Sequence, residues 1–202
     1  MGLPGSLKSE SRGDVGVLVV DGFSASGLLD RDTVVGIEKY FADLKYGIRA
    51  TVLALGSSTR RTSAQQGTAQ QGFGYWESWR RALQNIQYGD VPVVAALRGV
   101  VRGSGLELAA AAQLRVAERS ASYLLPQQSL ATYVRCGAVV RLPQLFGVSR
   151  LLDMMLTGRI HSAEEAHAMG FSNYLVDDGQ GLLKALEVAE VIAQRATIEC
   201  VN

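Results

Sequence analysis

The fold of this chain is constrained most by short apolar runs that alternate with longer amphipathic segments. Residues 15–20, 51–55 and 92–97 are almost continuously apolar and rich in valine, leucine and alanine. Such short runs predict strands that are covered on both faces of a sheet. Between them, residues 30–45 and 75–87 place apolar side chains at helical spacing. Strands that alternate with helices predict right-handed crossovers and a mostly parallel sheet.

The rest of the chain continues this pattern. The elements predicted after residue 100 are helices at 106–113, 138–146, 148–156, 162–169 and 181–196 and strands at 114–117, 121–125 and 171–176. Residues 56–72 are polar and Gly-rich without an apolar period, which predicts a loop. We expect residues 1–13 to form a flexible N-terminus. Residues 14–202 are expected to form a single domain.

The composition argues against several classes of protein. A chain of 202 residues with 48% hydrophobic residues can bury one core, and its net charge of +1 predicts no nucleic-acid partner. The chain has two cysteines, Cys136 and Cys200, which are too few for a disulfide framework and lack metal-ligand spacing with His161 or His167. We expect both histidines to be surface or packing residues. The apolar runs are shorter than the ~20 residues that cross a bilayer. We therefore expect a cytoplasmic protein without a membrane contact.

The segment most suggestive of chemistry runs through residues 98–108, where a predicted strand passes through small residues directly into a helix. The first amides of a helix lack intrahelical partners and carry the positive end of its dipole, so they can bind an oxyanion. Glu107, in the first turn, could move a proton at a carbon next to that oxyanion. The pair Ser104 and Glu107 also has the spacing of a capping box, which would only stabilise the helix start. Both interpretations stay open at this point.

Several sequence blocks from residue 92 onward follow one another in a specific order. Residues 92–99 (PVVAALRG) and 103–109 (GSGLELA) are followed by RLPQLFG at 141–147, LTGR at 156–159 and AEEAHAMGF at 163–171. These blocks resemble those of the crotonase (enoyl-CoA hydratase/isomerase) superfamily, whose GGGxELA motif corresponds to residues 103–109. The resemblance implies an α/β fold of the ClpP/crotonase type, a spiral of ββα units with a mostly parallel sheet. It also implies that the family's full C-terminal helical region is lacking here.

The resemblance further implies an oxyanion hole made of two backbone N–H groups. The second donor of the family falls on Ser104, and the first catalytic glutamate falls on Glu107. The first donor should follow the strand at 51–55. Because the family's CAGAD-like run is replaced by TSAQQG at this point, the first donor falls near Gln65 or Gln66.

The chain departs from the family at residues 125–128 (LPQQ), which align with the QPE segment of the hydratases. The second catalytic glutamate of the family thereby becomes Gln127, whose amide cannot act as a base near neutral pH. In the next turn, Tyr133 and Arg135 fall where decarboxylase and dehalogenase relatives carry reactive side chains. Tyr133 could equally pack in the core, and Arg135 could be a solvated loop charge.

The resemblance implies an enzyme that stabilises the enolate of an acyl thioester. We expect an enoyl-CoA or carrier-protein enoyl-thioester hydratase, dehydratase or isomerase. A role in secondary metabolism is suggested because the chain resembles short crotonase-like subunits of polyketide biosynthesis. An acyl-thioester decarboxylase and a non-catalytic accessory subunit are the alternatives. Trp76 and Trp79 are expected to form the buried face of their helix, although in this family that helix borders the acyl pocket.

The same resemblance implies the ligands and partners of the chain. No cofactor is expected beyond the coenzyme A or phosphopantetheine that forms part of the substrate. The expected partners are an acyl-CoA or acyl-carrier-protein thioester, further copies of the chain in a trimer or hexamer, and a biosynthetic partner enzyme.

Overall fold

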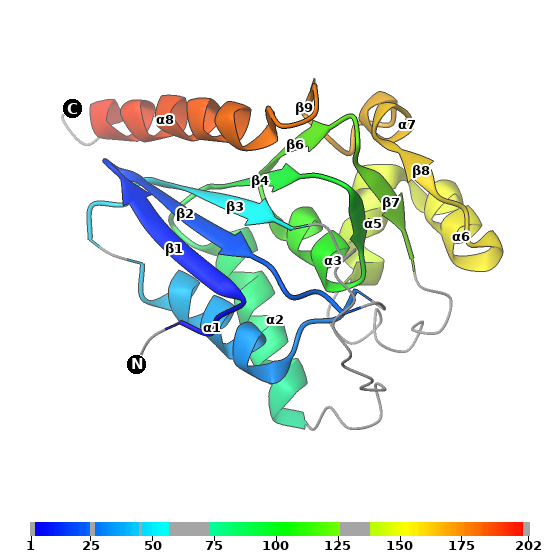
Figure 1. Ribbon diagram of the computed structural model, residues 1–202, viewed down its shortest axis with the longest axis horizontal. Coiled ribbons are helices and arrows are strands. Elements are labelled where there is room, and N and C mark those ends of the chain that lie inside the picture. The colour runs from blue at the N-terminus through cyan, green and yellow to red at the C-terminus, as the bar shows by residue number, and fades with distance from the viewer. Residues whose placement is uncertain (1–2, 25–26, 45, 57–72, 126–137, 200–202) are drawn as a thin grey trace.

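The computed structural model describes residues 3–24, 27–44, 46–56, 73–125 and 138–199. Its main element is a six-stranded sheet in the order β1-β2-β3-β4-β6-β9 (Figure 1). The strands are β1 (Leu7–Arg12), β2 (Val15–Val20), β3 (Ala50–Leu55), β4 (Val93–Leu97), β6 (Leu114–Glu118) and β9 (Tyr174–Val176). β1 pairs antiparallel with β2, and every later pair in this sheet is parallel. The predicted mostly parallel α/β fold is thus confirmed.

Both faces of the large sheet are covered by helices, as the continuous apolar runs predict. The helix α8 (Gly181–Glu199) lies along one face, and α1 (Arg31–Ala42), α2 (Phe73–Tyr88) and α3 (Ser104–Ala111) lie on the other (Figure 1). Side chains alternate between the two faces within a single strand. In β4, Val94 and Ala96 pack with α8 residues, whereas the side chains of Val93, Ala95 and Leu97 belong to the core shared with α1 to α3.

A second, three-stranded sheet is formed by one strand before α3 and two strands after it. It consists of β5 (Val100–Arg102), β7 (Ser122–Leu124) and β8 (His161–Ser162). Along the chain, α5 (Ala138–Phe146) and α6 (Val148–Thr157) lie between β7 and β8, and α7 (Ala163–Ala168) follows β8. An aromatic cluster joins these parts: the ring of Tyr123 meets that of Phe171 edge-on at 4.9 Å, and Phe146 stacks on Phe171 at 4.4 Å. This cluster fixes the second sheet against the helices behind it.

The N-terminal region differs from the sequence-based expectation. Residues 1–13 are predicted to be flexible, but Leu7–Arg12 forms β1 and pairs with β2 over its whole length. Only Leu7 of this strand is buried, so its sequence carries no run of apolar residues. An edge strand needs few apolar side chains, because its backbone hydrogen bonds on one side are sufficient to hold it in the sheet. The loop predicted at residues 56–72 lies almost entirely outside the described residues.

Candidate active site

The turn from β5 into α3 forms the base of the site. Gly103 has a φ of 56° and a ψ of −126°, a backbone conformation that glycine adopts without strain, and α3 begins at the next residue, Ser104. The N-cap is therefore Gly103, and no side chain caps the helix. The capping box that the spacing of Ser104 and Glu107 allows is not formed. The Glu107 carboxylate is consequently not used to satisfy the start of its own helix.

Glu107 lies one turn into α3 and points toward α2. Its side chain is only 2% exposed, and its Oε2 atom accepts a hydrogen bond of 2.9 Å from the indole Nε1 of Trp79. Burial raises the pKa of Glu107 to about 7, against the opposing effects of the Trp79 hydrogen bond and the positive charge of Arg141. A carboxyl group with a pKa near neutral can both accept and return a proton at physiological pH.

Trp79 is the first of two residues near Glu107 that the sequence-based site does not include. As its helical spacing predicts, Trp79 lies on the buried face of its helix, where it is 1% exposed within the main core. The structure adds that its N–H is the donor to Glu107. A buried tryptophan requires an acceptor for its N–H, which is a signal in the sequence, but the identity of that acceptor depends on how α2 packs on α3.

Arg141 is the second residue that the sequence-based site did not include. It lies in α5, where its guanidinium donates to the side-chain oxygen of Gln87 at the end of α2. Its positive charge favours the ionised form of Glu107. Arg141 belongs to the RLPQLFG block, which carries part of the family resemblance. The sequence therefore identifies the block, but it does not show that the charge of Arg141 acts on Glu107.

The backbone N–H of Ser104 is engaged within the protein. It donates a hydrogen bond of 2.9 Å to the carbonyl oxygen of Gly27. Gly27 has a φ of +81°, and a Cβ at this position would lie 2.7 Å from the carbonyl oxygen of Arg102. The segment at Gly27 is thus held in close backbone contact with the turn that precedes α3. A thioester oxygen that binds the Ser104 N–H would have to share or replace the Gly27 carbonyl.

Five predicted site residues, Gln65, Gln66, Gln127, Tyr133 and Arg135, lie outside the described residues. The described residues before the second of these gaps end at Leu125, just after β7. β7 ends at Leu124, which lies opposite Arg102 of β5 in the parallel pair. The structure therefore brings Ser104, Glu107 and Trp79 together and leaves the roles of the other five residues as predictions.

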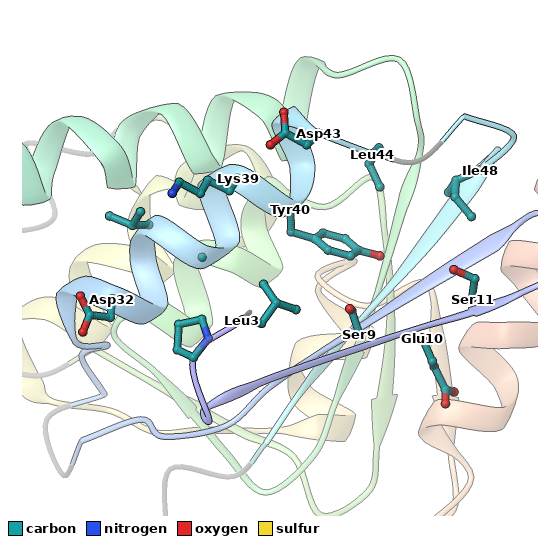
Figure 2. Close-up of a pocket in the computed structure, with 13 residues that line it drawn as sticks. Leu3, Ser9, Glu10, Ser11, Asp32, Lys39, Tyr40, Asp43, Leu44 and Ile48 are labelled. Atoms are coloured by element: carbon teal, nitrogen blue, oxygen red, sulfur yellow. The ribbon is translucent and has the colours of Figure 1, made fainter. Parts of the chain in front are cut away.

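A groove of about 720 Å³ lies elsewhere in the molecule, between β1 and α1 (Figure 2). Its walls come from the N-terminal segment, β1, α1 and Ile48, and none of its lining residues belongs to α2, α3 or β5. It is therefore separate from Glu107 and Ser104.

The two histidines behave as packing residues. His161 is 1% exposed and stacks on Phe146, while the Nδ1 atom of His167 lies 2.9 Å from the carbonyl oxygen of Ser172.

Within the described residues, no cluster of His, Cys, Asp and Glu could hold a metal ion. Among the helices described, none has the length and apolar character required to cross a bilayer.

Comparison with known proteins identifies the family. Residues 50–201 match the family model of enoyl-CoA hydratase/isomerase. Carnitinyl-CoA dehydratase of Salmonella typhi is 38% identical over 109 residues, which are 54% of this chain and 42% of the dehydratase, so the match spans less than half of that enzyme.

Solved structures agree with this assignment. A protein of Rhodopseudomonas palustris CGA009, provisionally named an enoyl-CoA hydratase, has a TM-score of 0.79 and 38% identity, with 94% of this chain and 75% of that chain covered. DspI of Pseudomonas aeruginosa has a TM-score of 0.83 at 24% identity, over 95% of this chain and 81% of that chain, which shows a shared fold. The chain therefore belongs to the enoyl-CoA hydratase/isomerase family, within the crotonase superfamily.

Proposed function

We propose that this chain binds an acyl-CoA thioester and catalyses the addition or removal of water next to the thioester carbonyl. The observation that carries the proposal is the buried carboxyl of Glu107, one turn into a helix, with a pKa of about 7. Relatives in the family bear the names of enoyl-CoA hydratases and of a carnitinyl-CoA dehydratase, which fit a lyase of this kind.

The proposed chemistry needs only one acid/base group. In hydration, the oxygen of a water molecule bonds to C3 of the enoyl group while Glu107 takes one proton from that water. The electron pair of the C2–C3 double bond moves toward the carbonyl, whose oxygen becomes negatively charged. The Ser104 N–H, which this oxygen shares with or takes over from the Gly27 carbonyl, and the dipole of α3 stabilise this charge, with Gln65 or Gln66 proposed as the second donor. Glu107 then returns the proton to C2, and dehydration is the reverse.

A single carboxyl suits the departure of this chain from the family at Gln127. An amide can orient the attacking water by hydrogen bonding but cannot take its proton. The proton therefore has to pass through Glu107 in both steps. A group with a pKa near 7 is suited to both because neither its acid nor its base form is strongly disfavoured at neutral pH.

The test is the turnover of crotonyl-CoA by the purified chain. We expect hydration by the wild type and a loss of ~100-fold or more with Glu107→Ala, the contribution typical of general acid–base catalysis. Glu118→Gln is the matched control. Glu118 is another buried glutamate, 6% exposed, whose carboxylate accepts from the backbone N–H of Gly181 at the start of α8, away from the site. Equal turnover by the wild type and Glu107→Ala would remove Glu107 from the mechanism.

The same assay separates the other candidate functions. A decarboxylase, in which Tyr133 or Arg135 orients the leaving carboxylate, would release carbon dioxide from a β-carboxyacyl thioester and leave crotonyl-CoA unchanged. An isomerase would move the double bond of a 3-enoyl thioester. An accessory subunit in secondary metabolism would turn over none of these thioesters and would co-purify with a biosynthetic enzyme. Parallel assays with CoA and carrier-protein thioesters identify the carrier.

A further inference from the structure

The outer edge of β1 is open in the structure. Within the part of the chain that is described, β2 is the only strand paired with β1, which ends the six-stranded sheet. The strand forms the outer border of the sheet in Figure 1. An open edge offers backbone N–H and C=O groups to another strand.

The pairing pattern shows which groups face outward. The N–H of Asp21 donates to the carbonyl of Ser6, and in an antiparallel ladder such hydrogen-bonded positions alternate along the strand. Lys8, Glu10 and Arg12 therefore bond to β2 through their backbones. The backbone groups of Ser9 and Ser11 point away from β2. The N–H of Leu7 is already used, because it donates to the carbonyl of Pro4.

The side chains of Ser9 and Ser11 leave space beside this edge. Leu7, on the same face, packs closely against Gly36 of α1, so closely that a Cβ on Gly36 would lie 2.6 Å from its Cδ1 atom. Further along, the two serines are too small to fill the gap, and they line the groove opposite Tyr40 and Ile48 (Figure 2). The strand edge is thus accessible beside Ser9 and Ser11.

The charges of β1 alternate on the opposite face of the strand. Lys8, Glu10 and Arg12 are all exposed and, being two residues apart, point the same way. Glu10 and Arg12 form an ion pair of 2.8 Å along the strand. Alternating signs make the strand complementary to an antiparallel second copy in a register that is offset by two residues from the centre of the charges, because opposite charges then lie across from each other.

We infer that β1 pairs with β1 of a second copy of this chain around a two-fold axis at Ser9. In this register Lys8 of each copy lies opposite Glu10 of the other. The N–H and C=O of Ser9 bond to those of the other Ser9. The two six-stranded sheets become one continuous sheet.

The charges also select this register over its neighbours. A shift to the next register that keeps the outward backbone groups paired places Lys8 opposite Lys8 in one direction and Glu10 opposite Glu10 in the other. Like charges directly opposite each other destabilise a strand pair. The register centred on Ser9 avoids these like-charge contacts, and it pairs more of β1 than the mixed register centred on Ser11. This inference does not depend on the proposed catalytic function.

The test is a charge exchange measured by sedimentation velocity over a series of protein concentrations. Lys8→Glu or Glu10→Lys alone turns both opposite-charge pairs of the two-fold contact into like-charge pairs, so each is expected to weaken association about tenfold or more. The double variant Lys8→Glu/Glu10→Lys restores opposite pairs and is expected to associate like the wild type. Arg80→Glu, an exposed charge reversal on α2, is the control and should change nothing.

Each outcome decides the inference. A wild-type chain that stays monomeric at all concentrations overturns it. So does an oligomer of any size that is equally stable in the wild type, the two single variants and the double variant, or a double variant that associates as weakly as the single ones. Circular dichroism of the variants checks that they remain folded, as expected for exposed side chains.

Discussion

Replacing Glu107 with glutamine is expected to raise the free energy of unfolding by about 3 kcal/mol at pH 8 and to leave it almost unchanged at pH 4. Burial raises the pKa of Glu107 from 4.5 to about 7, so ionising this group in the folded protein is costly. The cost is about 1.4 kcal/mol for each pH unit between the folded and unfolded pKa values. Glutamine is uncharged, and its side-chain oxygen can still accept from Trp79.

The sign of the pH dependence follows from which state binds the proton more tightly. Below about pH 4 Glu107 is protonated in both states, and its burial carries no charge penalty. Between about pH 4.5 and 7 the unfolded chain loses this proton first, so the contribution of Glu107 to stability falls as the pH rises. Above pH 7 the penalty is complete and constant.

Urea unfolding of the wild type and Glu107→Gln at pH values from 4 to 8 measures this effect. Subtracting the unfolding free energy of one protein from that of the other at each pH cancels the contributions of all other titrating groups. The difference in unfolding free energy should grow with pH and level off above pH 7. A difference that is the same at every pH would contradict a raised pKa in the folded state.

Truncation of Trp79 to alanine is expected to lower the free energy of unfolding by about 3–5 kcal/mol, as is typical when a large aromatic side chain leaves a cavity. The indole is 1% exposed and lies among core residues of α2 and α3. Trp76→Ala, three residues earlier and only half-buried, should cost clearly less. Urea unfolding at pH 7 gives both values.

Trp79→Phe separates the hydrogen bond from the packing. It keeps most of the apolar volume but removes the N–H that stabilises the ionised form of Glu107. The pKa of Glu107 should therefore rise further, and the pH at which the stability of this variant levels off should rise with it. An unchanged levelling point in Trp79→Phe would show that the indole N–H does not influence Glu107.

The sequence predicts well those parts of the fold whose burial leaves a local pattern. β2 coincides with the predicted run Val15–Val20, because a central strand that is buried on both faces must be apolar throughout. α3, with Ser104 and Glu107 in its first turn, is also a local feature, since glycine and small residues mark the turn that precedes it.

Other features depend on contacts between distant parts of the chain. Trp79 meets Glu107 across 28 positions of sequence, and the carbonyl of Gly27 meets the N–H of Ser104 only because the turn before α1 packs against the end of β5. β1 has one buried residue, and β8 has two residues in total, so neither leaves a detectable period. These contacts and short edge elements follow from the assembled core rather than from local sequence.

Glu107 is expected to move a proton at the carbon next to a thioester carbonyl, and the proposed function depends on this step. The most direct measurement is the exchange of the C2 protons of butyryl-CoA in heavy water, followed by proton NMR. This substrate has no double bond to hydrate, so exchange reports enolate formation alone. We predict exchange with the wild type and with Glu118→Gln, and exchange ~100-fold slower or more with Glu107→Gln. Equal exchange rates in Glu107→Gln and the wild type, or no exchange with the wild type, would contradict this role of Glu107.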